Sequence, residues 1–183
     1  MILPNPNPMK KSLTLSQSSL SKGAFRFILM VFGLLISWNV QAQVTKTSTS
    51  AGNWSTITWS PAGAPAAIDN VIIATAVTVN TPVTVNNLTI NAGQTLTMNG
   101  TNALTANGDL TVTGTLTGGA ATGAITINGN TAVSGTLALG AGSFSTIGTT
   151  TVSSPGLISD GTTGGTDTYG GLLTIGVGAS YTC

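Results

Sequence analysis

The chain has 183 residues, which is enough for one domain, and only 5% of them are charged, against about 25% in an average globular protein. It has no His and no Glu, its acids are four Asp, and four of its five basic residues lie before residue 27. The rest of the chain sets one Lys against four Asp, a net charge of −3, so no basic surface remains for nucleic acid. One cysteine, Cys183, excludes an internal disulfide framework and a cysteine-based metal site.

The first 42 residues have the pattern of a secretory signal peptide. A positively charged segment precedes ten apolar residues, FILMVFGLLI from Phe27 to Ile36, and a small-residue site, Val40-Gln41-Ala42, follows. A membrane-spanning helix needs about 20 apolar residues, roughly twice this run. We therefore predict a signal-peptide helix within residues 1–42, cleavage after Ala42, a secreted or cell-surface protein, and no membrane span after cleavage.

Residues 43–70 are predicted to be a lead-in and a cap. A Ser/Thr-rich stretch is followed by GNWSTITWSPAGAP, in which Trp54 and Trp59 are the only tryptophans after residue 42. The first coil of a repeat array has no neighbour over its open core, so large side chains just ahead of the repeats are expected to cover it. The alternative is that the two flat, amphipathic indoles form a sugar-stacking platform.

Residues 71–183 carry the repeats. Short runs in which apolar residues alternate with Thr and Asn end at Asn or Gly, which is typical of half-buried strands joined by turns. LTINAGQTLTM from Leu88 recurs 85 residues later as LTIGVGASYTC from Leu173. NGDLTVTGTLT from Asn107 recurs 21 residues later as NGNTAVSGTLA from Asn128. Four steps of about 21 residues nearly fill 85, so both matches fit one array.

Runs joined by Asn-Gly also fit antiparallel hairpins, so a meander or sandwich is the alternative fold. A near-constant period with like residues at equivalent positions favours a coil that advances ~4.8 Å per turn and stacks each residue on its equivalent. We predict an all-β fold, a right-handed parallel β-helix (β-solenoid) with coils of about 21 residues. In this register Val112 and Val133 are inward neighbours, four residues before Leu116 and Leu137.

The ionisable residues after residue 42 are too few for most catalytic sites. Glycoside hydrolysis generally uses two carboxylates, and lyase chemistry uses a base with a cation. Asp160 and Asp167 are the only close pair, and their setting, SDGTTGGTDTYGG, predicts two solvated turn acids or a chance cation site. Asp109 has Asn130 as its repeat equivalent, so no Asp recurs as in calcium-binding repeats. We predict no catalytic, cofactor-binding or metal-binding residue and no enzymatic activity.

Threonine is the most informative surface residue. Threonines alternate with apolar residues over 111–117, and Thr136 and Thr151 lie on the predicted neighbouring coils. A flat row of hydroxyls and methyls is suited to contact with a glycan, a protein or the ordered water of ice. The plainer interpretation is that Thr has a high β propensity and stacks well on itself.

The segments GNWSTITWSPAGAP, VNNLTINAGQTLTMNG and NGDLTVTGTL resemble the N-terminal cap and first coils of large, secreted, adhesin-like β-solenoid proteins of Bacteroidota. The likeness covers roughly residues 52–183. It implies a structural or adhesive module at the cell surface, with a glycan or a protein as ligand. The alternatives are the N-terminal part of a β-helical carbohydrate-active enzyme with its catalytic part elsewhere, and a threonine-ladder protein that binds ice or glycan. The C-terminal sorting domain common in such proteins has no equivalent here.

Cys183 takes the place of Met98 under the 85-residue offset, on the inward row of a strand. We therefore expect its thiol to be buried as a small hydrophobe and to have no function of its own. Because the chain stops in mid-repeat without a polar cap, we also expect a longer parent protein, and end-to-end association of this segment through its open last coil.

Overall fold

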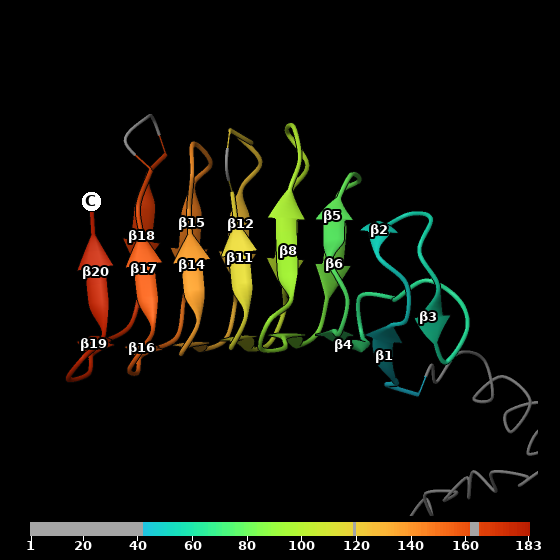
Figure 1. Cartoon of the computed structure of the whole chain (residues 1–183), viewed down its shortest axis with the longest axis horizontal. Helices are drawn as coiled ribbons and strands as arrows, with labels where there is room; N and C mark the ends of the chain where they lie inside the picture. Colours follow the sequence, from blue (N-terminus) through green and yellow to red (C-terminus); the bar gives the residue numbers. More distant parts are fainter. Residues whose placement is uncertain (1–41, 119, 162–164) are drawn as a thin grey trace, which may run out of the picture. The chain divides into compact units, whose positions relative to one another are not determined.

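The computed structural model describes residues 42–118, 120–161 and 165–183, and these form a stack of coils (Figure 1). The predicted signal peptide falls outside the described residues, apart from Ala42 at its end. Alternation of apolar and polar residues produces short strands, because each coil turns a corner after every two to four paired residues. The strands are β1 (Thr45–Ser48), β2 (Gly52–Asn53), β3 (Trp59–Ser60), β4 (Asn70–Ile73), β5 (Val77–Val79), β6 (Val83–Val85), β7 (Leu88–Ile90), β8 (Thr95–Met98), β9 (Leu104–Ala106), β10 (Leu110–Val112), β11 (Thr115–Thr117), β12 (Ile125–Ile127), β13 (Thr131–Val133), β14 (Thr136–Ala138), β15 (Phe144–Thr146), β16 (Thr150–Val152), β17 (Leu157–Ser159), β18 (Asp167–Tyr169), β19 (Leu173–Ile175) and β20 (Ser180–Thr182).

The strands form three parallel sheets that the chain visits in turn. Sheet A has the order β19-β16-β13-β10-β7-β4-β1-β3, sheet B has the order β2-β5-β8-β11-β14-β17-β20, and sheet C has the order β18-β15-β12-β9-β6. From β4 onward each coil contributes one strand to A, one to B and one to C. Every pairing is parallel except that of β3 with β1. The predicted β-solenoid is confirmed, and the antiparallel meander is excluded for the described residues.

The register agrees with both sequence repeats. Leu88, Leu110, Thr131, Thr150 and Leu173 are successive partners in sheet A, separated by 22, 21, 19 and 23 residues. The predicted 85-residue offset is therefore four coils of unequal length. Val112 pairs with Val133, and both side chains are at most 1% exposed, so the predicted inward stacking is confirmed.

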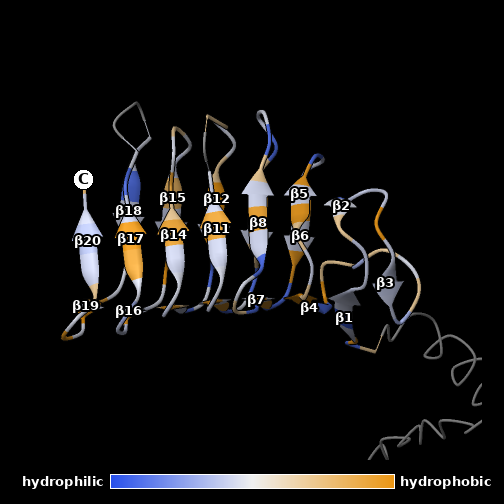
Figure 2. Ribbon diagram, in the orientation of Figure 1, coloured by the Kyte–Doolittle hydropathy of each residue, from blue (hydrophilic) through white to orange (hydrophobic). Residues whose placement is uncertain are grey.

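The core is a set of inward rows in which like stacks on like. In sheet B one row contains Val77, Leu96, Leu116, Leu137 and Ile158, and each of the last four is fully buried. Figure 2 shows this row as the hydrophobic middle residue of β11, β14 and β17. Each such side chain stabilises the fold by about 1.5 to 3 kcal/mol only while its neighbours cover it, so the coils depend on one another.

Side-chain oxygens tie the corner between sheets C and A from coil to coil. Asn87 Oδ1 accepts the backbone N–H of Asp109 at 2.7 Å, and Asp109 Oδ1 accepts that of Asn130 at 2.7 Å. Asn130 Oδ1 then accepts the N–H of Thr149 at 3.0 Å. This series, the corner ladder, gives Asp109 a structural role as a hydrogen-bond acceptor.

Glycine is required where successive corners approach closely. A Cβ atom placed on Gly135 would lie 2.0 Å from the carbonyl oxygen of Gly114 on the coil before it. Glycine at this corner is therefore explained by the stacking distance between coils.

The N-terminal end of the stack is closed. Strand β1 pairs in parallel with β4, and β2 pairs with β5, so part of the Ser/Thr-rich lead-in forms strands ahead of the first sequence repeat. Strand β3 folds back antiparallel on β1 and covers the edge that sheet A would otherwise leave free.

The last coil, β18 to β20, has one edge without a partner among the residues that the structure describes. Its inward row is accordingly less well covered, since Ile175 is 39% exposed whereas its partner Val152 on the coil before is fully buried. Cys183 is exposed as well, so the prediction of a buried thiol is wrong. Its position after β20 does match that of Met98 after Thr97, but Met98 is covered by further coils. Within the described ranges no helix has the length and apolar character needed to cross a membrane.

Candidate functional site

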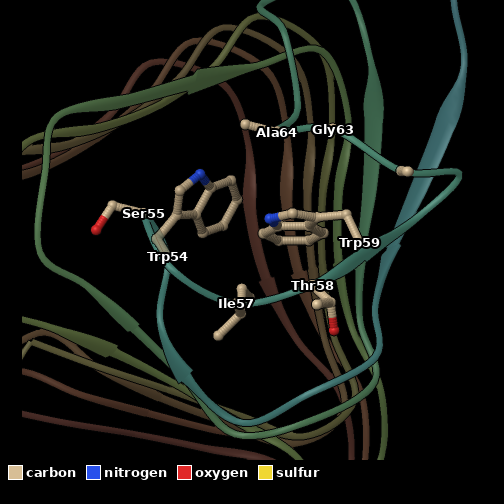
Figure 3. Close-up of a pocket in the computed structure, with 8 residues that line it drawn as sticks. Trp54, Ser55, Ile57, Thr58, Trp59, Gly63 and Ala64 are labelled. Carbon is tan, nitrogen blue, oxygen red and sulfur yellow. The ribbon is translucent and has the colours of Figure 1, made fainter.

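Trp54 and Trp59 lie together over the open end of the first coil (Figure 3). Their ring centroids are 4.8 Å apart with an angle of 56° between planes, and the side chains are only 5% and 6% exposed. The backbone N–H of Trp54 donates to the carbonyl of Thr78 at 2.8 Å and fixes this segment to strand β5. Both indoles therefore pack onto the end of the hydrophobic core, and an open stacking platform is wrong because the ring faces are covered.

A pocket of about 240 Å³ opens beside the two indoles. Its apolar walls come from both tryptophans, Ile57 and the loop 62–64, and its polar walls come from Ser55 and Thr58. Figure 3 shows these side chains arranged around the space. The sequence signal for this site was the pair of tryptophans, but nothing in the sequence located the loop 62–64 beside them.

Most polar groups of the pocket already have partners. Ser55 Oγ accepts from Asn80 Nδ2 at 2.8 Å, and the Thr58 hydroxyl bonds Ser50 Oγ at 3.0 Å. Among the described residues that line the pocket, the exception is the indole Nε1 of Trp59, which is buried and has no hydrogen-bond acceptor. A buried donor without an acceptor is rare in proteins and calls for an explanation.

The one lysine of this part of the chain holds the pocket wall in place. Lys46 lies in register with Val71, which makes it an inward residue at the end of the core, and it is buried. Its Nζ donates to the carbonyl oxygens of Pro61 at 3.0 Å and Ala62 at 2.8 Å. This ammonium group is therefore committed to the backbone of the loop 62–64 and its neighbour.

Asp69 is also a structural residue of the cap. Its Oδ2 accepts the N–H of Ala66 at 2.8 Å, and its Oδ1 accepts the N–H of Val44 at 3.2 Å. The carboxylate is buried and joins the turn before β4 to the start of the described chain.

Asp160 directly follows β17 and Asp167 begins β18, and the two carboxylates are close enough for the charge of one to act on the other. Asp167 is the first residue of β18, in register with Phe144, whose N–H donates to its Oδ1 at 3.2 Å. Burial raises the pKa of Asp167, and the negative charge of Asp160 raises it further. The prediction of two solvated turn acids is wrong for Asp167, since this side chain is half-buried in a strand. No group of three or more potential metal ligands occurs in the part of the chain that the structure describes.

The threonines form rows on more than one face. On sheet B, Thr95, Thr115 and Thr136 make one outward row, and Thr78, Thr97 and Thr117 make a second. Thr111 belongs to sheet A, and Thr113 sits at the corner, where its hydroxyl donates to the carbonyl of Ile90 at 2.7 Å. The predicted single row over 111–117 is therefore split between two faces. The two sheet-B rows end at Leu157 and Ala138.

Comparison with known proteins gives no significant match: no family model, no curated protein and no solved structure matches the chain.

Proposed function

We propose that the chain is an exported structural or adhesive module, secreted or held at the cell surface, that has no catalytic activity of its own. The observation that carries this proposal is the pair of threonine rows on sheet B, held in register on a rigid stack. The charged residues support the absence of catalytic activity, because the side chains of Lys46, Asp69 and Asp109 are hydrogen-bonded to the backbone. The resemblance of the cap and first coils to adhesin-like solenoids of Bacteroidota supports it as well.

The outward face of sheet B is suited to a polymeric ligand. Hydroxyls and methyls repeat along each row at the coil spacing of ~4.8 Å, which lets one face make the same contact several times. Six threonines in two rows present both hydrogen-bonding and apolar groups without charge. A glycan or an extended protein segment offers matching groups, so binding is expected to depend little on salt.

Binding by sheet B is tested on glycan and protein arrays with paired variants of the full chain. In the test variant Thr97→Lys and Thr117→Lys place two charges on one sheet-B row, and in the control Thr105→Lys and Thr126→Lys place them on sheet C. The proposal expects the sheet-B variant to lose at least tenfold in binding while the control keeps it. Equal binding by both variants would remove sheet B as the contact face.

Export is tested separately by expressing the full chain in a bacterial host. We expect the protein outside the cytoplasm with a mass that begins at Gln43. A mass that still includes the apolar segment Phe27–Ile36 would contradict the proposed export.

A carbohydrate-active enzyme is the second candidate, and the raised pKa of Asp167 beside Asp160 is the observation that favours it. The test is turnover on a polysaccharide panel. Activity that disappears in Asp160→Asn or Asp167→Asn would replace the non-catalytic proposal.

The double row on sheet B also suits ordered water, as in an ice-binding protein. Thermal hysteresis that is lost in the Thr97→Lys, Thr117→Lys variant would favour that function over adhesion.

A further inference from the structure

We propose that Asn99 is a site of spontaneous deamidation, and that the fold protects the two other Asn-Gly pairs, Asn107-Gly108 and Asn128-Gly129, from the same reaction. In an Asn-Gly pair the backbone nitrogen of the glycine can reach the side-chain carbonyl carbon of the asparagine, because glycine has no side chain in the way. The three pairs share this local chemistry, so the fold decides which of them reacts. The modification does not depend on what sheet B binds.

The reaction needs only water. The backbone nitrogen of Gly100 loses its proton and attacks the side-chain carbonyl carbon Cγ of Asn99, and the bond from Cγ to the side-chain nitrogen breaks. That nitrogen leaves as ammonia with its own two hydrogens and one proton, which replaces the proton lost by Gly100. A cyclic imide, the succinimide, remains. Water then opens this ring at either carbonyl and gives aspartate or isoaspartate, so the chain gains one negative charge.

The backbone nitrogen of Gly100 is accessible for this attack. Its N–H has no hydrogen-bond acceptor among the described residues, and both Asn99 and Gly100 are exposed. The carbonyl oxygen of Gly100 accepts the N–H of Thr122 at 2.9 Å, which fixes the turn but leaves the nitrogen unbonded. A Cβ atom placed on Gly100 would meet only Asn102 Nδ2, at 4.0 Å, so this corner is not pressed against the coil before it.

The nitrogens of the two other glycines are held by the preceding coil. The N–H of Gly108 donates to the carbonyl oxygen of Asn86 at 2.8 Å, and the N–H of Gly129 donates to that of Gly108 at 2.9 Å. A Cβ atom on Gly108 would collide with Asn87 Oδ1. One on Gly129 would collide with Asp109 Oδ1. Attack by either nitrogen therefore requires its corner to leave the stack and to give up the corner-ladder bond of the next residue.

The new carboxylate would lie at the corner that ends β8, two residues after Thr97, beyond the tip of this strand in Figure 1. Thr97 belongs to an outward threonine row of sheet B, so deamidation adds a charge beside the face that we propose for binding. After residue 42 the net charge of one Lys and four Asp, −3, becomes −4 with one more acid. Ageing of the protein thus changes this face without any enzyme.

The test is to incubate the folded full chain at mildly alkaline pH, digest it in acid and follow the three Asn-Gly peptides by mass spectrometry. Deamidation is measured from the mass gained when the side-chain –NH₂ becomes –OH. We expect Asn99 to react at least about tenfold faster than Asn107 or Asn128, because each of these must first open its backbone hydrogen bond and a corner-ladder bond. The control is the same chain in urea, where the three rates should converge.

Two outcomes of this experiment would overturn the proposal. The first is that Asn99 in the folded chain reacts no faster than the other two asparagines. The second is that the tenfold difference persists in urea, since the neighbouring residues and not the fold would then select the site.

A pair of variants checks the site by isoelectric focusing of the aged folded chain. Asn99→Gln should remove the main acidic species, because glutamine would have to close a larger ring, which forms more slowly. The control, Asn91→Gln, changes another exposed asparagine that is followed by alanine and should leave that species unchanged. Persistence of the acidic species in Asn99→Gln would contradict the assignment. Both variants leave the threonines of sheet B in place, so a failure here is distinct from a failure of the proposed binding.

Discussion

Replacing Leu116 by alanine measures how much stability comes from stacking one coil on the next. The side chain is fully buried between Leu96 and Leu137. Removing its three outer carbons costs about 2.4 kcal/mol at ~0.8 kcal/mol per carbon. The neighbours are fixed by the parallel register and can collapse only partly, so the cavity should bring the total to about 3 to 4 kcal/mol.

The assay is urea unfolding of the full chain followed by circular dichroism, and the control is Thr115→Ala on the outward side of the same strand. The control should cost less than about 1 kcal/mol, because it changes an outward-facing, only partly buried side chain. A loss below about 1 kcal/mol for Leu116→Ala, or equal losses for both variants, would refute the stacking argument.

Three further changes test the corners and the last coil. Gly135→Ala brings a Cβ within 2.0 Å of the Gly114 carbonyl oxygen and should lower the unfolding free energy by more than about 2 kcal/mol in the same urea assay. The control is Gly176→Ala, which should cost less because the nearest contact of its Cβ would be 3.1 Å. Asp109→Asn keeps the acceptor for the Asn130 N–H and should keep nearly the original unfolding free energy, while Asp109→Ala should lower it by about 0.5 to 1.5 kcal/mol. Equal losses in the two variants would mean that the charge of Asp109 matters and the corner ladder does not. Because the pKa of Asp167 is raised in the fold, the folded last coil binds a proton more tightly than the unfolded chain does. The stability of the last coil is therefore greatest below about pH 4 and falls as the pH rises through the raised pKa of Asp167. Asp167→Asn should abolish this fall, as hydrogen exchange of β18 at pH 3 and pH 7 would show, and an unchanged pH dependence would contradict the assignment.

The sequence was sufficient for the architecture because the repeat carries it. Alternation of apolar and polar residues selects strands, and like residues at equal spacing select the parallel register that pairs Val112 with Val133. The face of the solenoid on which a given threonine lies was harder to predict. Thr111 and Thr115 look continuous in sequence, but the corner at Gly114 places them on different sheets.

What the sequence missed depends on contacts between distant residues. Lys46 looks like a surface residue of a polar lead-in, and it becomes an inward residue only because β1 pairs with β4. Asp167 follows a Gly- and Thr-rich stretch that favours a loop, yet its register with Phe144 puts it in a strand. The prediction that Cys183 is buried was wrong, because a side chain on the last coil is covered only where another coil follows, and the local sequence pattern does not encode that.

The central claim is that successive coils stack in parallel and in register, and methyl NOE spectroscopy of the labelled chain tests it most directly. We predict strong NOEs between the methyl groups of Val112 and Val133 and between those of Leu116 and Leu137. An antiparallel hairpin that pairs strands β10 and β11 across Thr113 and Gly114 would instead give close Hα–Hα contacts between residues 111 and 116, the first pair after such a turn that is not hydrogen-bonded. That pattern, together with the absence of the Val112–Val133 NOE, would contradict the solenoid.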